Sequence, residues 1–219
     1  MQLTRRHFVG AALAATAGAS AISVLAAARP MPPVPPAALA QARAHVRQDE
    51  RPPLLDEALA ALDSHSRQVA RRDRLALVDF DLTSRLPRMH LVDVEGGRIE
   101  RSLLVAHGSG SDPSATGMLR RFSNDPGSNA SSRGAFVTAT AYYGKHGLSQ
   151  RLMGLDPTNN RALERAIVLH GAQYVDPALI ASQGRIGRSQ GCFAVEPGEI
   201  AALMEQLGEG RLIYASKLV

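Results

Sequence analysis

A mainly β domain with a few helices is the fold that this sequence predicts, and three observations support it. The composition is that of an ordinary globular protein, with 45% apolar and 21% charged residues among 219, and this length suits one large domain or two small ones. From residue 75 onward, short runs rich in Val, Leu, Phe and Tyr alternate with breaks that contain Gly or Pro, which is typical of strands and turns. No internal repeat is visible.

The predicted elements follow one another in a simple order. Apolar residues near helical spacing predict one helix over residues 54–70. Residues 95–97, Glu-Gly-Gly, separate two apolar runs and predict a hairpin turn. Residues 107–133 are dense in Ser, Gly, Asn and Pro, and an irregular stretch of that length is usually functional or mobile. Strands are predicted within 75–81, 88–94, 98–108, 134–144, 165–171 (apolar, and buried on both faces) and 211–218, and a short helix closed by Gly within 197–210.

The first 28 residues have the order of parts found in an export signal. Arg5 and Arg6 precede a weakly apolar run that ends in small residues at 26–28. The arginine pair resembles a twin-arginine signal, whose translocon carries folded proteins, so residues 1–28 are predicted to be removed and the mature protein to lie in the periplasm. The alternative is an uncleaved anchor, although a span needs about 20 apolar residues and this run barely reaches that. Residues 29–53 are rich in Pro and predict an extended linker.

The formal net charge is +5 at pH 7. Such an excess favours polyanionic surroundings in general but does not single out a nucleic acid. The sequence has no zinc-finger spacing and no basic segment interleaved with aromatic residues. We therefore predict neither a nucleic-acid partner nor a stable membrane span after the signal is removed.

Cys192 is the only cysteine in the chain. In an oxidising compartment cysteines usually occur in pairs, so a single one is an intermolecular bridge, an inert buried thiol or a reactive group. His170 ends a predicted strand, and an imidazole at hydrogen-bond distance would make the thiol a nucleophile. Arg185 and Arg188 are expected to lower the pKa of that thiol, and the amides of Gly191 and Cys192 are candidate oxyanion donors. By spacing alone, an inert buried thiol is the simpler interpretation.

His170 together with the Ser-Gln-Gly-Cys run at 189–192 resembles the signature of the L,D-transpeptidases of bacterial cell walls, which have a YkuD-type catalytic domain. That signature is a His, a variable gap, Ser or Thr, then His-Gly-Cys, an apolar residue and Asn or Arg. Six blocks in the right order resemble, more closely, the murein L,D-transpeptidase catalytic domain family. The blocks are LVAHGSGSD, RFSNDPGS, SSRGAFVT, YYGKHGLSQRLMGLD, RAIVLHGAQYV and GRIGRSQGCFAV.

The resemblance implies a YkuD-like β-sandwich or mixed-sheet catalytic domain over residues 72–219, preceded by a helix over 54–71. It also implies that Cys192 attacks a carbonyl of a peptidoglycan stem peptide and forms a thioester. His170 would take the thiol proton and later serve the incoming amine, while the carbonyl of Gly171 would hold its imidazole in the working tautomer. Stem peptides are the implied partners, and neither a metal nor an organic cofactor is needed.

Two positions depart from the family signature. Gln190 replaces the His that usually precedes Gly-Cys, and Ala194 replaces the Asn or Arg two residues after Cys192. Gln donates hydrogen bonds but does not titrate, so proton transfer would rest on His170 alone. Because a familiar substrate contact is lost, the donor bond is left open between diaminopimelate–D-Ala and L-Ala–D-Glu.

A second polar cluster lies in the block YYGKHGLSQR. Tyr143, His146 and Arg151 of this block are expected to line the cleft and bind stem carboxylates, since Arg suits bidentate recognition. Ser189, Gln190 and Arg188 are expected to line it from the cysteine side. The alternative for the block is a solvated turn after a strand, and His107 is interpreted as structural.

Three other functions remain as alternatives. The first is an L,D-carboxypeptidase, in which water rather than an amine resolves the thioester. The second is a zinc hydrolase, although no HxxxH or HxH spacing supports it. Its candidate ligands are His107, His146, His170 and an acid such as Asp112. The third is a non-catalytic wall-binding module in which the Pro-rich segment is a spacer. The oligomeric state is not predicted.

Overall fold

A computed structural model describes residues 54–218. The predicted signal segment at 1–28 and the predicted linker at 29–53 lie outside the described residues. The elements are α2 (Leu55–Ser64), β1 (Arg74–Asp79), β2 (Met89–Asp93), β3 (Arg98–Leu103), the 3-10 helix η1 (Ser109–Ser111), β4 (Gly134–Gly144), β5 (Gly147–Gly154), β6 (Val168–Gly171), α3 (Pro177–Gln183), β7 (Phe193–Val195), α4 (Ile200–Leu207) and β8 (Leu212–Ser216).

One mixed sheet of eight strands organises the described chain, in the order β3-β2-β1-β8-β4-β5-β6-β7. The pairs β1–β8 and β6–β7 are parallel, and the other neighbouring strands are antiparallel. The prediction of a mainly β fold with a few helices is therefore confirmed, and of the two expected arrangements the structure has the mixed sheet. The expected hairpin turn at 95–97 joins β2 to β3.

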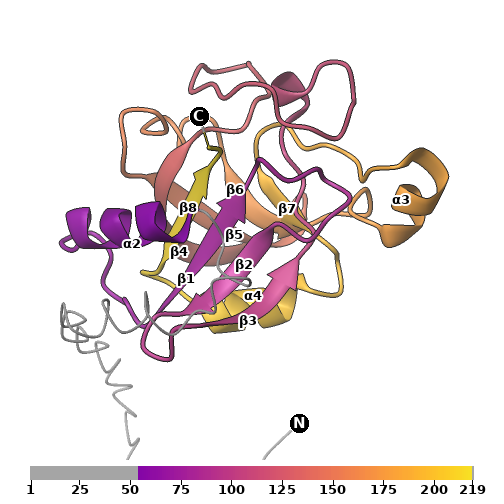
Figure 1. Cartoon of the computed structure of the whole chain (residues 1–219). Helices are drawn as coiled ribbons and strands as arrows, with labels where there is room; N and C mark the ends of the chain where they lie inside the picture. Colours follow the sequence, from indigo (N-terminus) through magenta and orange to yellow (C-terminus); the bar gives the residue numbers. More distant parts are fainter. Residues whose placement is uncertain (1–53, 219) are drawn as a thin grey trace, which may run out of the picture.

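The central strands are buried on both faces because helices cover both sides of the sheet (Figure 1). Alternate residues of β1 point to opposite sides, and Leu75 belongs to the apolar cluster under α2 whereas Ala76 belongs to the larger cluster under α4. The larger cluster includes a group of aromatic rings in which Phe136 and Phe193 meet edge to face, with ring centroids 5.3 Å apart. This doubly covered sheet is the rigid support for the site at its β6–β7 end.

The helix α2 is shorter than the sequence predicts. Its buried face is formed by Leu55, Ala58, Leu59 and Leu62, but it ends at Ser64 rather than near residue 70. The Ser64 hydroxyl donates to the carbonyl of Ala60 at 2.9 Å, a local bond that competes with the helix. Val69, the last apolar position of the pattern, still reaches the core, but through a turn.

Two other segments differ from expectation near the site. The strand expected over 165–171 covers only the last four residues, because Ala166 has a left-handed backbone with φ of 52°. The helix α3 was not predicted at all. Its signals are nevertheless present: Asp176 caps the first turn by accepting from the Ala178 amide at 2.8 Å, and Gly184 closes the last turn with φ of 74°.

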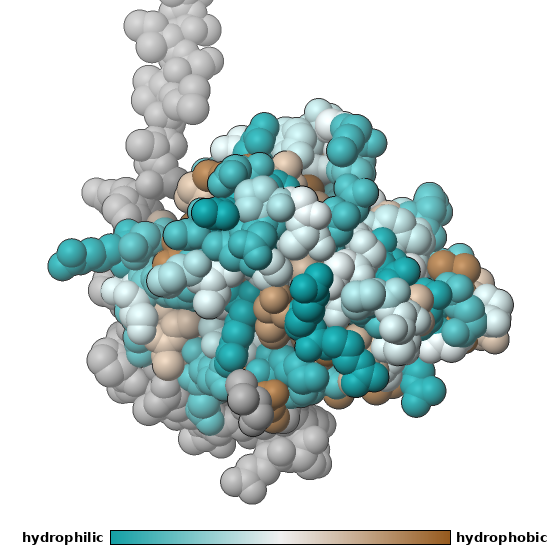
Figure 2. All heavy atoms as spheres, turned by 90° about the horizontal axis from the view of Figure 1, so that it is seen from above, coloured by the Kyte–Doolittle hydropathy of each residue, from teal (hydrophilic) through white to brown (hydrophobic). Residues whose placement is uncertain are grey.

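The long segment between β3 and β4 is irregular, as expected, and it crosses one end of the sheet (Figure 1). It is also packed, since Ser111, Asp112, Leu119 and Ser131 within it are fully buried. Figure 2 shows a largely hydrophilic face on which apolar atoms form small separate areas. Among residues 54–218, no helix has the length and apolar character needed to cross a membrane.

Candidate active site

The strand pairing brings His170 and Cys192 to one face of the sheet. In the parallel pair β6–β7, Leu169 lies opposite Phe193 and His170 lies opposite Ala194. Side chains directly across a pair share a face and alternate along each strand. Cys192, one residue before β7, therefore points to the same side as His170, and both side chains line one cavity.

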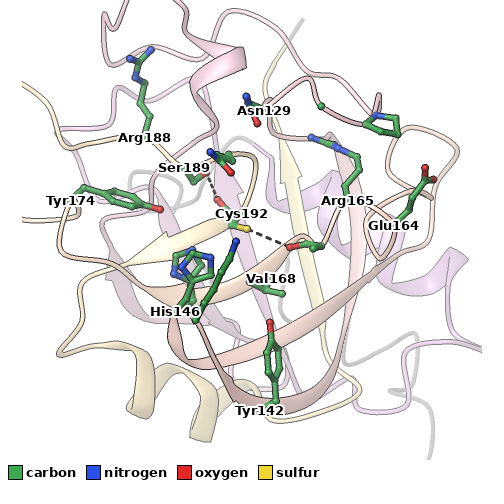
Figure 3. Close-up of a pocket in the computed structure, with 16 residues that line it drawn as sticks. Asn129, Tyr142, His146, Glu164, Arg165, Val168, Tyr174, Arg188, Ser189 and Cys192 are labelled. Carbon is green, nitrogen blue, oxygen red and sulfur yellow. Dashed lines mark hydrogen bonds between the residues drawn. The ribbon is translucent and has the colours of Figure 1, made fainter.

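That cavity has a volume of about 690 Å³ and a basic lining (Figure 3). Lys145, Arg165 and Arg188 contribute positive charge, and Glu164 contributes the single carboxylate. Figure 3 shows Arg165, Arg188 and His146 arranged around Cys192. The remaining lining residues are Pro126, Gly127, Asn129, Tyr142, Ala166, Val168, His170, Tyr174, Ser189 and Gln190. An anionic ligand is the chemistry that such a lining favours.

His170 is 2% exposed, and its Nδ1 lies 2.9 Å from the carbonyl oxygen of Gly171. A carbonyl only accepts hydrogen bonds, so Nδ1 carries the proton and Nε2 keeps a free lone pair. The ring of His146 stacks on that of His170 at a centroid distance of 4.4 Å. Burial lowers the pKa of His170 below its ordinary value, and the charges of His146 and Lys145 lower it further against the opposing effect of the Gly171 carbonyl.

The thiol of Cys192 is held against the backbone on the other side. Its Sγ lies 3.7 Å from the carbonyl oxygen of Ala166, the residue whose left-handed backbone ends β6 early. Burial raises the pKa of Cys192, although the Val168 amide and the charges of Lys145 and Arg165 act in the opposite direction. A raised thiol pKa and a lowered imidazole pKa keep both groups neutral at neutral pH.

The expectation that Arg185 and Arg188 lower the thiol pKa is wrong. The Arg188 guanidinium donates to the backbone carbonyl of Asp112, and that of Arg185 donates to the carbonyl of Ile186. The cations that favour the thiolate are Lys145 and Arg165. The sequence placed the right type of charge near Cys192 but assigned the effect on the thiol pKa to the wrong residues, because the guanidinium groups of Arg185 and Arg188 bond backbone carbonyls, although Arg188 still lines the cavity.

The turn at residues 188–192 is closed by the Ser189 hydroxyl. This hydroxyl accepts from the Gly191 amide at 3.1 Å and donates to the Cys192 carbonyl at 2.7 Å. Gly191 has φ of 112°, and a Cβ there would lie 2.7 Å from the carbonyl oxygen of Ala130, so only glycine fits. Its amide, expected to donate to an oxyanion, is occupied by Ser189, and this leaves the Cys192 amide as the remaining candidate of the two.

The second polar cluster reaches the cavity only in part. His146 and Lys145 line the cavity, whereas Tyr143 is 83% exposed and lies outside it. Tyr142 takes the place expected for Tyr143, and Arg151 packs over its ring with the guanidinium carbon 4.6 Å from the centroid. Tyr143 and Arg151 therefore do not line the cavity that contains Cys192.

Arg165 is the main residue of the site that sequence reasoning missed. Its guanidinium donates to the carbonyls of Ser123 and Ala130 and to the Ser132 hydroxyl, at 2.9, 2.5 and 2.5 Å. It thereby fastens the long β3–β4 segment beside Cys192. Tyr174, also missed, lines the opposite wall, and burial raises the pKa of its phenol to about 12. Arg165 lies inside the quoted block RAIVLHG, but nothing in that block distinguishes it from a surface arginine.

The residues named for a zinc site are divided between two places. His107 pairs with Asp112 in the protein interior, whereas His146 stacks on His170 at the cavity. Within the described part of the chain, no three His, Cys, Asp or Glu side chains are grouped so that they would hold a metal ion.

Comparison with known proteins gives one family and several distant structural neighbours. No curated protein matches the chain. Among solved structures, an L,D-transpeptidase from Mycobacterium smegmatis has 15% sequence identity and a TM-score of 0.39, with 66% of this chain and 58% of that one covered. An L,D-transpeptidase from Xylanimonas cellulosilytica has 17% sequence identity and a TM-score of 0.41, with 82% of this chain and 77% of that one covered. An L,D-transpeptidase from Stackebrandtia nassauensis has 17% sequence identity and a TM-score of 0.39, with 78% of this chain and 70% of that one covered. The chain thus spans little more than half of the Mycobacterium smegmatis protein.

The family model that matches describes an L,D-transpeptidase catalytic domain, and the match covers residues 47–216. This is most of the chain, and it includes α2 as well as the whole sheet. The family acts on cell-wall peptidoglycan. The chain belongs to the L,D-transpeptidase catalytic domain family.

Proposed function

We propose that this protein is a periplasmic cysteine acyltransferase that cross-links peptidoglycan stem peptides through a thioester on Cys192. The observation that carries the proposal is the placement of His170 and Cys192 on one face of neighbouring parallel strands, at one cavity, with His170 Nε2 left free as a base. A free lone pair on the imidazole is what general-base activation of a neutral thiol requires.

In the first half-reaction, the sulfur of Cys192 attacks the donor carbonyl carbon while Nε2 of His170 takes the thiol proton. The carbonyl becomes an oxyanion, to which the Cys192 amide is positioned to donate. When the carbon–nitrogen bond breaks, the leaving amine takes the proton from the imidazolium. The enzyme then holds the acyl group as a thioester, and His170 is neutral again.

In the second half-reaction, the amine of a neighbouring stem attacks the thioester carbonyl. His170 removes a proton from that amine, the carbon–sulfur bond breaks, and the departing sulfur takes the proton back. If water replaces the amine, the same steps release a free carboxylate and the enzyme acts as an L,D-carboxypeptidase. The geometry serves both outcomes, because the acceptor enters after the donor's leaving group has gone.

The charge of the cavity supports a stem peptide as the donor. Such peptides carry free carboxylates, and Lys145 and Arg188 are the cations at the wall that would pair with them. His146, Ser189 and Gln190 line the same cavity and complete the proposed binding surface. The hydrogen bonds of Arg165 are already used by the neighbouring segment, so we assign it to the thiol and not to substrate.

Ala194 is the reason for leaving the donor bond open. It is fully buried in β7, and its carbonyl accepts from the Ala106 amide at 2.8 Å. An Asn or Arg at this position would have to displace the apolar cluster around Ala106 and Ile186. The usual side-chain contact is therefore missing, and we keep both diaminopimelate–D-Ala and L-Ala–D-Glu as candidate donor bonds.

The location and the division of the chain belong to the same proposal. Residues 1–28 serve as a twin-arginine signal and 29–53 as a linker, followed by a segment at 54–71 that contains α2 and by the catalytic domain at 72–219. A protein that acts on cell-wall peptidoglycan works outside the cytoplasm, which agrees with an export signal.

Cell fractionation of a strain that carries Arg5→Lys together with Arg6→Lys tests the proposed location, since both substitutions keep the charge. Retention of the precursor in the cytoplasm is expected.

Digestion of sacculi tests the reaction. Purified sacculi are incubated with the protein, digested with a muramidase, and the muropeptides are identified by mass. We expect new cross-linked dimers with the wild type and none with Cys192→Ala, whose fold is checked by circular dichroism. Shortened monomers without dimers would favour the carboxypeptidase. Equal products from the wild type and Cys192→Ala would exclude the thioester mechanism.

A further inference from the structure

Three buried side chains, charged or titratable, are not used by the proposed reaction. They lie next to the turn at residues 188–192, which we call the catalytic turn. Arg88, His107 and Asp112 are each 0% exposed, and none of them lines the cavity. Arg88 immediately precedes β2, and the other two flank η1. We call these three residues the buried Arg–His–Asp cluster.

The cluster is organised by the donors of Arg88. Its Nε and Nη2 donate to the carbonyl of Val105 at 3.0 and 2.8 Å, its Nη1 donates to the carbonyl of Leu82 at 2.9 Å, and its Nη2 lies 2.7 Å from Nδ1 of His107. A guanidinium only donates, so Nδ1 of His107 is the acceptor and Nε2 carries the proton. The tautomer of His107 is therefore fixed by Arg88.

The proton on His107 Nε2 faces Asp112. Nε2 lies 3.4 Å from Oδ2 of Asp112, which is within ion-pair range, but it makes no hydrogen bond. Asp112 is otherwise satisfied by the amides of Thr116 and Gly117 at 2.9 and 2.8 Å. Burial and the charge of Arg88 lower the pKa of His107 to about 4, so the imidazole is neutral at neutral pH.

The backbone of the cluster is bonded directly to the catalytic turn. The Ser189 amide donates to the His107 carbonyl at 2.9 Å, and the Ser109 amide donates to the Ser189 carbonyl at 2.8 Å. The Arg188 guanidinium donates to the Asp112 carbonyl. Ser189 in turn holds Gly191 and Cys192 through its hydroxyl. One continuous set of hydrogen bonds thus joins Arg88 to the residue that carries the thiol.

Stability alone is a poor explanation for this arrangement. Buried charged groups pay a large desolvation cost, and well-packed apolar residues of similar volume often replace them without loss of stability. The segment around His107 has no strand ladder of its own beyond two isolated bridges, Ala106 to Ala194 and Gly108 to Ser189. Side-chain hydrogen bonds therefore have to fix a backbone that regular structure does not fix.

We propose that the buried Arg–His–Asp cluster is a positioning device, in which Arg88 and Asp112 lock the His107 side chain so that its backbone holds the catalytic turn in register for acyl transfer. The inference rests on the proposed function, because the turn is assigned there as the thiol and oxyanion site. Arg88, His107 and Asp112 do not line the cavity, so they act on it through the residues that they hold, Ser189 and Arg188.

The test compares two reactions of the same thiol. Alkylation by iodoacetamide needs the sulfur alone, whereas acylation by a synthetic stem tetrapeptide or by imipenem also needs the carbonyl aligned with the turn. In folded His107→Phe, acylation is expected to fall about 100-fold, the loss that a small misplacement of reacting groups causes, while alkylation stays within about threefold of the wild type. His107→Asn keeps an acceptor for Arg88 and is expected to recover much of the acylation rate.

His90→Phe is the matched control. His90 lies on β2 near Arg88 in the sequence, but its Nδ1 bonds the Ser102 hydroxyl at 2.8 Å, on the neighbouring strand β3. It is expected to leave both rates unchanged. Equal acylation by the wild type and folded His107→Phe would overturn the proposal, and so would a parallel fall of both reactions, which would indicate a change in the thiol itself.

Two further measurements decide the remaining outcomes. If His107→Phe does not fold, Asp112→Asn carries the same comparison, since it keeps the side-chain shape but places an amide donor against the cluster. If the wild type is alkylated but never acylated, the proposed function fails, and hydrogen exchange then tests positioning alone. Exchange of the Ser189 amide is expected to quicken at least tenfold in the folded cluster variant and not in His90→Phe. Unchanged exchange would refute the positioning role.

Discussion

Acidification is expected to destabilise the protein through His107, and the structure sets the size of the effect. Burial is the main cause that lowers the pKa of this imidazole from 6.5 to about 4. Above pH 6.5 the folded and unfolded forms both hold it neutral, so it has no effect on stability there. Between pH 6.5 and 4 the unfolded chain binds a proton that the folded protein refuses, and stability falls as pH falls.

The magnitude follows from the two pKa values. Each pH unit in this window costs about 1.4 kcal/mol, so the full loss is about 3.5 kcal/mol, and about 2.5 kcal/mol of it is reached by pH 4.5. Because His107 is fully buried, screening by solvent does not reduce this loss in the free energy of unfolding. A loss of this size is a large part of the stability of an ordinary domain.

Urea denaturation at a series of pH values measures the effect. The free energy of unfolding is obtained for the wild type and for His107→Asn at pH 7 and at pH 4.5. Burial also lowers the pKa of His90 and His170, but both are present in each protein and cancel in the comparison. We expect the wild type to lose about 2.5 kcal/mol more than the variant. The same loss in both proteins would refute the assignment of His107 as a buried neutral imidazole.

Three other changes test separate parts of the structure. Lys145→Met removes a charge that favours the thiolate of Cys192, so the pH at which iodoacetamide alkylation is half-maximal is expected to rise, and an unchanged profile would contradict that electrostatic role. Gly191→Ala places a Cβ 2.7 Å from a carbonyl oxygen at φ of 112°. We expect at least a 100-fold loss of acylation and a strain cost of about 1–3 kcal/mol. Normal turnover would show that the turn relaxes freely. Phe193→Ala empties a buried aromatic position and is expected to cost about 3–5 kcal/mol in thermal or urea unfolding, against less than 1 kcal/mol if the neighbouring rings close the gap.

The parts of the fold that follow from local pattern were predictable from sequence. Alternating apolar runs predicted the mainly β fold, and the glycine-rich break at 95–97 predicted the hairpin between β2 and β3. The helix α3 also had a local signal in its Asp176 and Gly184 caps, which we did not use. These features depend on a few neighbouring residues, so the sequence contains the information directly.

The orientation of side chains around the cavity was less predictable. Tyr143 was expected at the cleft because it belongs to the block YYGKHGLSQR, but the β4–β5 pair has a register shift between Thr138 and Ala141. A bulge of this kind changes which residues face which side of a sheet, and Tyr142 faces the cavity instead. No local pattern in the sequence marks the position of that shift.

Long-range contacts were the least predictable part of the site. Arg165 fastens a segment more than thirty residues away in the sequence, and Arg88 fixes a histidine from beyond the β2–β3 hairpin. Their roles depend on where distant backbone carbonyls lie in the folded chain. For the same reason Arg188 was expected to lower the pKa of the thiol, whereas Lys145 and Arg165 do so and the Arg188 guanidinium bonds the Asp112 carbonyl.

Peptide mapping of a trapped acyl-enzyme tests the central claim most directly. The protein is mixed with a synthetic stem tetrapeptide, quenched in acid and digested, and the fragments are analysed by mass spectrometry. The account predicts a thioester on the fragment that contains Cys192, the only cysteine of the chain, with a mass that identifies the donor bond. New peptide products in the absence of any acyl group on that fragment would contradict it.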